Sequence, residues 1–202
     1  MEELKPLIVT FVVLFVIIGF FLFIFQDKEP AMTETPDQTK QENGITLQKE
    51  MEKLTIKSSA FKNNDSIPPK YTCDGDNVNP LIEILNVPKE AKSLALVMED
   101  PDATGGVTWD HWLLWNIDPQ TNYIEEDNVP SGAVQGRTSF GSARYGGPCP
   151  PRGSKPHRYM FRVYALDTVL NLAEGEPKSA LLKAMEGHVL AEGLLIGLYE
   201  RQ

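Results

Sequence analysis

Two carboxylates lie close together at the end of an apolar segment. Residues 93–98 form a short apolar run, and Asp100-Pro101-Asp102 follows it almost directly. Proline cannot continue a hydrogen-bonded strand ladder, so the tripeptide is expected where a strand ends. Side chains two residues apart on an extended chain point to the same side, so both carboxylates are predicted to face one cleft. The alternative is an Asp-rich turn with no role in binding.

Two of the three histidines are candidates for the same site. His111 lies in the aromatic and apolar segment 109–117, where a histidine is more often a buried structural residue. His157 directly follows a stretch rich in proline and glycine. An unperturbed imidazole has a pKa near 6.5, so it can bind an anion as a cation or hydrogen-bond as a neutral ring. His188, which follows a glycine, is predicted to be structural.

The stretch before His157, residues 145–156, reads Tyr-Gly-Gly-Pro-Cys-Pro-Pro-Arg-Gly-Ser-Lys-Pro. Proline fixes the backbone angle φ, while glycine leaves backbone N–H groups uncovered. Uncovered N–H groups in a rigid turn form a concavity that binds anions. The loop therefore predicts an anion site. The longer stretch from Asp118 to Gly153 has a length that is typical of functional or disordered loops.

Charge is unevenly distributed along the chain. The net charge is −9, yet residues 128–166 contain no Asp or Glu. Residues 93–136 contain no Lys or Arg. The basic residues of 128–166 are Arg137, Arg144, Arg152, Lys155, Arg158 and Arg162. An acidic protein with one basic stretch can concentrate a small anion without binding nucleic acid. A chance distribution of surface charge is the alternative.

Periodicity predicts a mainly β domain that would position these residues. Short apolar or alternating runs bounded by Pro, Gly, Asn and Asp are typical of strands. The predicted strands are residues 54–58, 93–98, 109–117, 159–166 and 194–199. One helix is predicted over 180–186, with Ser179 as its cap and Gly187 as its break. Several strands and one late helix indicate a mainly β fold with helical additions.

The N-terminal segment predicts a membrane anchor. From Leu7 to Phe25 the chain carries no charge. At about 1.5 Å per residue, a helix of this length reaches roughly 28 Å, close to the hydrocarbon thickness of a bilayer. A cleaved signal peptide would have a shorter apolar region followed by small residues, whereas bulky residues follow here. A buried core helix is the remaining alternative.

The rest of the chain divides into a linker and a domain. Residues 26–53 are charged and contain few large apolar side chains, so they predict a flexible tether after the anchor at 1–25. Residues 54–202 form the predicted domain. A short tail before a single span favours a domain outside the cytoplasm, although the flanking lysines give little bias.

Several motifs occur in order and together resemble a known family. They are Asp100-Pro-Asp-Ala, His111-Trp112, residues 145–151, Gly153 and His157-Arg-Tyr. They resemble the signature of the phosphatidylethanolamine-binding protein family, also called Raf kinase inhibitor-like, in its bacterial and archaeal branch. Segments 67–75 and 187–193 extend the similarity over nearly everything after Leu54. The resemblance implies a large antiparallel sheet packed with a second smaller sheet, a C-terminal helix and a pocket for phosphate-like groups.

The resemblance also implies a set of pocket residues. They are Asp100, Asp102, His111, Gly147, Pro148, Cys149, His157 and Tyr159. Ile84 and Thr104 depart from the pattern of the branch, which puts the shape of the pocket rim and the choice of ligand in question. Cys73 and Cys149 match pocket-side loops, so we expect them to approach each other near the pocket mouth. They would form a disulfide in an oxidising compartment or remain two buried thiols.

These features favour ligand binding with a regulatory role over catalysis, with no cofactor and no metal. The predicted ligand is a small phosphate or a phosphoethanolamine group, with carboxylates taking the amine and imidazoles and N–H groups taking the phosphate. The resemblance also implies an alternative, an inhibitor of a serine protease or a kinase that acts through surface loops. A metal-dependent hydrolase using His111, His157 and Asp100 is a further alternative. The sequence contains no closely spaced pair of histidines that would support this hydrolase alternative.

Overall fold

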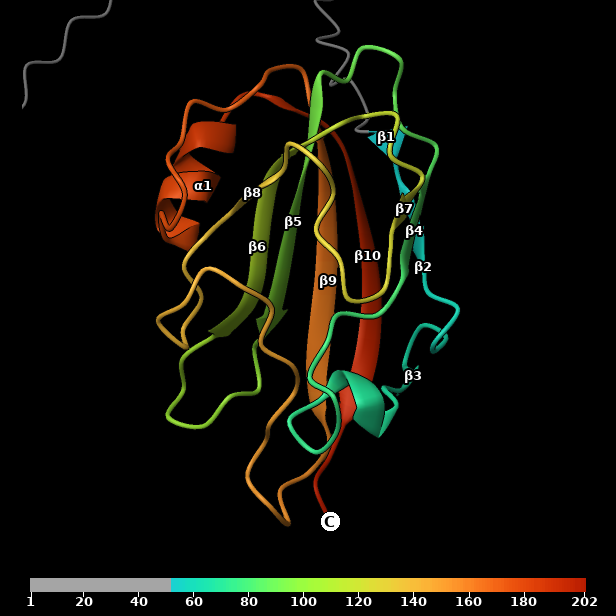
Figure 1. Cartoon of the computed structure of the whole chain (residues 1–202), viewed down its shortest axis with the longest axis vertical. Helices are drawn as coiled ribbons and strands as arrows, with labels where there is room; N and C mark the ends of the chain where they lie inside the picture. The colour runs from blue at the N-terminus through green and yellow to red at the C-terminus, as the bar shows by residue number, and fades with distance from the viewer. Residues whose placement is uncertain (1–51) are drawn as a thin grey trace, which may run out of the picture. The chain divides into compact units, whose positions relative to one another are not determined.

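The computed structural model describes residues 52–202 (Figure 1). The predicted anchor from Leu7 to Phe25 and nearly all of the predicted linker therefore lie outside the described residues. Within residues 52–202, no helix has both the length and the apolar character needed to cross a bilayer.

The domain is built on a seven-stranded sheet in the order β1-β10-β9-β5-β6-β8, with β3 also pairing with β10. The strands are β1 (Glu52–Lys53), β3 (Asp65–Ser66), β5 (Ser93–Asp100), β6 (Trp109–Ile117), β8 (Val134–Gln135), β9 (His157–Leu166) and β10 (Val189–Tyr199). The long strands pair antiparallel, as predicted. The short strands β1 and β3 instead run parallel to β10. The side-chain period of two is the same in both arrangements, so the sequence pattern could not reveal this.

A smaller antiparallel sheet covers one face of the large one. It contains β2 (Thr55–Lys57), β4 (Ile82–Leu85) and β7 (Tyr123–Ile124). Its buried Ile56 and Ile84 belong to the same apolar core as Leu94, Leu96 and Met98 of β5. The predicted pair of sheets is confirmed. Ile84 lies in this core, so its departure from the family pattern does not shape a pocket rim.

The opposite face of the large sheet is covered by the helix α1, Lys178–Met185 (Figure 1). Its Leu181 and Met185 pack with Ala95 and Val97, the alternate residues of β5. Covering both faces explains why β5 is an almost continuous apolar run. The predicted helix is confirmed, but its predicted cap is wrong. The helix begins after Pro177, without a side-chain hydrogen bond at the cap, so Ser179 lies within its first turn.

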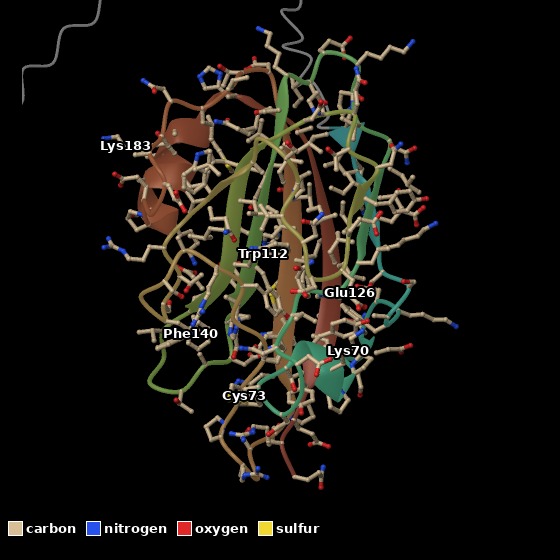
Figure 2. The ribbon with its side chains drawn as sticks, in the orientation of Figure 1. Lys70, Cys73, Trp112, Glu126, Phe140 and Lys183 are labelled. Carbon is tan, nitrogen blue, oxygen red and sulfur yellow. A yellow bond between two sulfur atoms is a disulfide. The ribbon has the colours of Figure 1, made fainter. Side chains whose placement is uncertain are left out.

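Strand pairing brings distant parts of the chain to one end of the large sheet. Asp100 ends β5 and lies opposite Trp109, the first residue of β6. The first residue of β9, His157, pairs with Tyr199 at the end of β10. In Figure 1 this is the lower end of the sheet, where the C-terminus and the 3-10 helix η1 (Pro69–Tyr71) lie. Figure 2 shows Phe140 and Cys73 at the same end.

Candidate functional site

The centre of the site is a buried pair, Asp100 and His157. As whole residues, Asp100 is 3% exposed and His157 is 5% exposed. The Nδ1 atom of His157 lies 2.8 Å from Oδ2 of Asp100. The other carboxylate oxygen accepts the backbone N–H of Asp102 at 2.8 Å. Because a carboxylate accepts, Nδ1 of His157 carries the proton. The second ring nitrogen, Nε2, is then the one available to a ligand.

His111 lies beside this pair, and its ring is likewise held by a hydrogen bond at Nδ1. Its Nδ1 lies 2.6 Å from the carbonyl oxygen of Gly146, so Nδ1 donates and Nε2 holds a lone pair. Burial lowers the pKa of His111, against the opposing influence of the Gly146 carbonyl and of Asp100. The imidazole is therefore neutral at neutral pH. Its ring packs edge to face on Tyr159, with 5.1 Å between centroids.

Tyr159 contributes a hydroxyl group whose proton has no acceptor among the described residues, although the backbone N–H of Cys149 is directed at its oxygen. The residue is fully buried. Burial, and then the negative charge of Asp100, raise the pKa of this hydroxyl, so it remains protonated and can donate. A buried hydroxyl without a partner loses about 1–3 kcal/mol of solvation, which a ligand can restore.

These groups open into a cavity of about 280 Å³. Asp100, His111, His157 and Tyr159 provide its polar lining. Its remaining lining is largely apolar and comprises Ala103, Thr104, Trp109, Phe140, Cys149, Pro150 and Pro151. A polar centre within apolar walls is typical of small-molecule sites, and this volume is at the small end of their range. Thr104, unlike Ile84, does lie at this cavity.

Asp102 does not line the cavity, so the prediction that both carboxylates face one cleft is wrong. Its carboxylate accepts from Arg158 Nε at 2.8 Å and from Arg158 Nη2 at 2.7 Å. It also accepts the backbone N–H of Arg158 at 3.0 Å. The guanidinium lowers the pKa of Asp102 to about 2. The two side chains do not point to the same side, because β5 ends at Asp100 and the chain turns at Pro101.

The predicted open N–H groups of the proline- and glycine-rich loop are largely occupied. Gly146 N–H donates to the His111 carbonyl at 3.0 Å, and Gly147 N–H donates to Asn77 Oδ1 at 2.8 Å. A Cβ at Gly147 would lie 2.4 Å from the Tyr71 carbonyl oxygen, so this loop approaches the backbone of another segment closely. Of the predicted residues Gly147, Pro148 and Cys149, only Cys149 lines the cavity.

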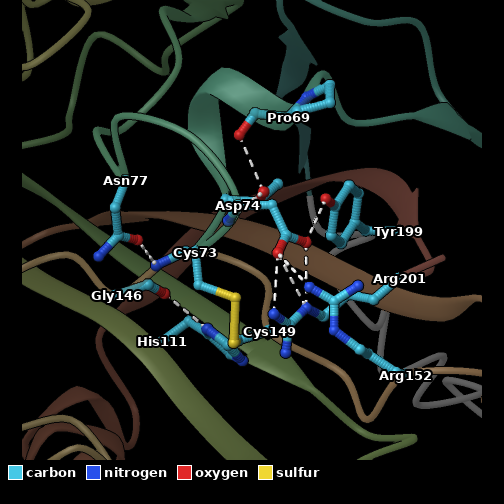
Figure 3. Close-up of a disulfide and its surroundings, with 12 residues drawn as sticks. Pro69, Cys73, Asp74, Asn77, His111, Gly146, Cys149, Arg152, Tyr199 and Arg201 are labelled. Atoms are coloured by element: carbon cyan, nitrogen blue, oxygen red, sulfur yellow. Dashed lines mark hydrogen bonds and ion pairs between the residues drawn. A yellow bond between two sulfur atoms is a disulfide. The ribbon is translucent and has the colours of Figure 1, made fainter.

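Cys73 and Cys149 form a disulfide beside the cavity, with 5.4 Å between their Cα atoms (Figure 3). The residue after Cys73, Asp74, accepts from the Tyr199 hydroxyl and from Arg201 Nη2, each at 2.8 Å. These contacts join the segment after η1 to the end of β10. The disulfide links this segment to the loop that carries Cys149, and Cys149 lines the cavity.

The basic stretch is partly neutralised by the acidic one, which corrects the idea of an open anion-attracting field. Arg158 pairs with Asp102, and Arg162 Nε lies 3.5 Å from Glu99 Oε1. Arg152 lies 3.8 Å from Asp74. Opposite charges from separate parts of the sequence thus pair on neighbouring strands and loops. Proximity in the fold, and not in the sequence, determines which cations remain free.

Residues 52–202 contain no group of three His, Cys, Asp or Glu side chains arranged to hold a metal ion. Asp100 faces Nδ1 of His157, so these two residues do not form a facial triad with His111. The hydrolase alternative receives no support from this geometry.

Sequence reasoning missed the aromatic wall of the cavity. Phe140 is 47% exposed, and its ring packs edge to face on Trp109 and His111, with centroids 5.5 and 5.3 Å away. A Cβ on Gly146 would lie 2.5 Å from the Phe140 ring, so this glycine makes room for it. A single phenylalanine among Thr, Ser and Gly at 138–142 was the available signal, because it belongs to no core pattern.

A family model described as phosphatidylethanolamine-binding protein matches residues 57–200. The chain belongs to this family. The UPF0098 protein of Methanothermobacter thermautotrophicus is 50% identical over 153 residues, which cover 73% of this chain and 99% of that protein. The UPF0098 protein PH1269 of Pyrococcus horikoshii is 49% identical over 158 residues, covering 75% and 79% of the two chains.

Solved structures of the family show the same fold. The phosphatidylethanolamine-binding protein homolog CT736 of Chlamydia trachomatis has a TM-score of 0.70 and 41% identity, covering 74% of this chain and 99% of that one. Escherichia coli YbcL, described as a member of the mammalian PEBP family, has a TM-score of 0.70, 31% identity and the same two coverages. The resemblance predicted from the motifs is confirmed, and with it the mainly β fold of two sheets and a helix.

Proposed function

We propose that this phosphatidylethanolamine-binding family domain binds a small phosphate-bearing ligand, such as a phosphoethanolamine group, in the 280 Å³ cavity. The observation that carries the proposal is the Tyr159 hydroxyl. It is fully buried, lies at the cavity and has no acceptor for its proton in residues 52–202. Buried polar groups are nearly always hydrogen-bonded, so a partner from outside the chain is expected.

The other polar groups suit a ligand with both signs of charge. Asp100 is an acceptor held by His157, and the neutral His111 presents a lone pair at Nε2. Both favour an ammonium group. Tyr159 supplies a hydrogen-bond donor for an oxygen of the ligand. A zwitterion therefore matches the cavity better than a simple anion.

We propose binding with a regulatory role and not turnover. The Asp100–His157 pair has the arrangement of a general base with its orienting carboxylate. Among the described residues around the cavity, however, no serine is present, and the single cysteine is held in a disulfide. The pair then serves to fix the direction of the His157 ring for a ligand.

Titration of the full chain with phosphoethanolamine tests the proposal. The protein would be kept in a maltoside detergent, which carries no phosphate, and binding followed by calorimetry. We expect Tyr159→Phe to weaken binding about tenfold, because it removes one hydrogen bond without leaving a protein group unpaired. His157→Ala should weaken it at least as much. His188→Ala is the control, since His188 bonds exposed Asp167 away from the cavity. Equal affinity of wild type and Tyr159→Phe would contradict the proposal.

We also propose that the domain lies outside the cytoplasm. The disulfide supports this placement, because disulfides persist in oxidising compartments. The predicted anchor from Leu7 to Phe25, with its short preceding tail, supports a single-pass topology. Protease added to intact cells should cleave the domain. Complete protection until the envelope is opened would reject the placement.

A further inference from the structure

The chain contains one Asn-X-Ser/Thr sequence, Asn64-Asp65-Ser66. In such a sequence the asparagine amide is the acceptor of an N-linked sugar, and the hydroxyl two residues later is part of the signal. A motif this short also occurs by chance. Its value therefore depends on where the fold places the two side chains.

The motif lies in an exposed turn at an edge of the large sheet. Residues 62–66 are all exposed, and the last two of them form β3, which pairs with β10 (Figure 1). The backbone N–H of Asn64 donates to the carbonyl of Ile196 in β10 at 2.7 Å. The backbone of the turn is thereby held against the sheet, while its side chains reach solvent. A large group attached to this turn would displace no part of the core.

Two adjacent asparagines in this turn differ in their contacts. Oδ1 of Asn63 accepts the backbone N–H of Ile196 at 2.9 Å, so this side chain satisfies a donor at the edge of the sheet. The side-chain amide of Asn64 makes no hydrogen bond with any residue from 52 to 202. Its nitrogen is therefore accessible, and the fold does not require the group.

The backbone of the turn offers a structural reason for Asn64 but none for Ser66. Asn64 has a φ of 66°, in the left-handed region, which asparagine adopts more readily than most residues. Ser66 is exposed, and its hydroxyl makes no hydrogen bond within the described part of the chain. The turn needs only the asparagine, whereas the acceptor motif needs both residues.

We propose that Asn64 is an N-glycosylation site whose sugar donor is a lipid-linked oligosaccharide phosphate. Nδ2 of Asn64 forms a bond to the anomeric carbon of the sugar and loses one proton. The bond from that carbon to the lipid phosphate breaks, and the phosphate leaves with the electron pair. The transfer takes place on the outer face of a membrane, so it rests on the proposed placement outside the cytoplasm, which the disulfide supports. It does not depend on the ligand, because residues 63–66 do not line the cavity.

Mass spectrometry of the full chain, purified in detergent from its native host, tests this site. Trypsin releases residues 63–70 as one peptide, because a lysine precedes it and a lysine ends it. The mass of this peptide shows an attached sugar, and its fragmentation locates the sugar. We expect wild type to carry the sugar on Asn64. Asn64→Asp and Ser66→Ala should abolish the modification completely, and Ser66→Thr should retain it. Asn63→Asp is the matched control and should also retain it, since an Asp side chain still accepts the N–H of Ile196.

The site is overturned if the wild-type peptide 63–70 has its unmodified mass, or if the sugar persists after Ser66→Ala. Urea unfolding establishes that each variant is folded before its peptide is compared. If protease cleaves the domain on intact cells and the peptide is unmodified, the glycosylation fails while the placement stands. If the domain is protected and the peptide is unmodified, both fail. Phosphoethanolamine binding is tested separately by Tyr159→Phe, so either result leaves the proposed ligand unaffected.

Discussion

The cavity end of the large sheet and its helix-covered face both hold a carboxylate beside a basic side chain, but the two regions use these groups differently. On the helix-covered face, Lys178 lies 2.9 Å from Glu99 and also pairs with Asp110. Burial lowers the pKa of Lys178, but the two carboxylates more than offset this, so its pKa is raised. At the cavity end, Asp100 orients His157, while the proton of the Tyr159 hydroxyl has no acceptor among residues 52–202.

We infer that the polar groups of the helix-covered face stabilise the fold, whereas those of the cavity end serve to bind a ligand. The Lys178 cluster is held by contacts within the chain, and α1 packs beside it through Leu181 and Met185. The buried indole N–H of Trp115 on this face also has no partner among the described residues, but unlike the Tyr159 hydroxyl it does not line the cavity.

At the cavity end, the Tyr159 hydroxyl has no acceptor among residues 52–202 and lines a space that a ligand can occupy. The loops of this end are held by the disulfide and by the Asp74–Arg201 pair. Changes on the helix-covered face should therefore alter stability and spare binding.

Loss of the disulfide should have the largest effect on stability. Cys73 and Cys149 are 76 residues apart, and closing a loop of that size restricts the unfolded chain by up to about 4 kcal/mol in chain-entropy models. The double variant Cys73→Ser/Cys149→Ser should lower the free energy of unfolding by up to this amount, measured by urea denaturation. Reductant should destabilise the wild type and leave the double variant unchanged. A difference below about 1 kcal/mol would show that the cavity end is held mainly by its hydrogen bonds.

Lys178→Met should have the next largest effect. It leaves Asp110 without its cation and leaves Glu99 with only Arg162, whose Nε lies 3.5 Å away. Both carboxylate side chains are less than one-fifth exposed. We expect a loss of about 2 kcal/mol in the free energy of unfolding, below the range for fully buried pairs. Lys183→Met is the matched control, since Lys183 lies exposed on the same helix (Figure 2). Phosphoethanolamine affinity should not change. A loss of affinity similar to that of Tyr159→Phe would undermine the comparison of the two regions.

Local pattern was sufficient to predict most of the fold. The predicted strand at 109–117 has the bounds of β6, because its aromatic and apolar residues are bounded by turn-forming ones. The ends of β9 and β10 were predicted less well. His157 and Arg158 begin β9 although both are polar, because they extend the pairing with β10. Pairing across the sheet is a tertiary effect that a single segment does not encode.

The candidate site was predictable in its residue types but not in its contacts. Asp100, His111, His157 and Tyr159 line the cavity, as the motifs implied. The contact that occupies the N–H of Gly147 comes from Asn77, 70 residues away in the chain. No local pattern signals a partner at that distance. The ion pair of Asp102 likewise depends on a turn that changes the direction of one side chain.

Replacing Asp102 should have the smallest effect on the free energy of unfolding, and it tests the comparison of the two regions most closely. Its folded pKa is about 2, below an ordinary value of 3.8, so its ionised form stabilises the fold above about pH 4. That contribution should be lost as the pH falls from about 4 towards 2. Asp102 is 32% exposed and Arg158 is 52% exposed as side chains, so solvent screening keeps the effect of Asp102→Asn below about 1 kcal/mol. Urea unfolding between pH 3 and 7 should show wild type and Asp102→Asn converging at the acidic end. Added salt should narrow the difference in unfolding free energy between wild type and Asp102→Asn at neutral pH.

Because Asp102 lies outside the cavity, the variant should retain its affinity for phosphoethanolamine. A loss of affinity would show that the pair with Arg158 positions the cavity, and would place Asp102 with the groups that serve the ligand.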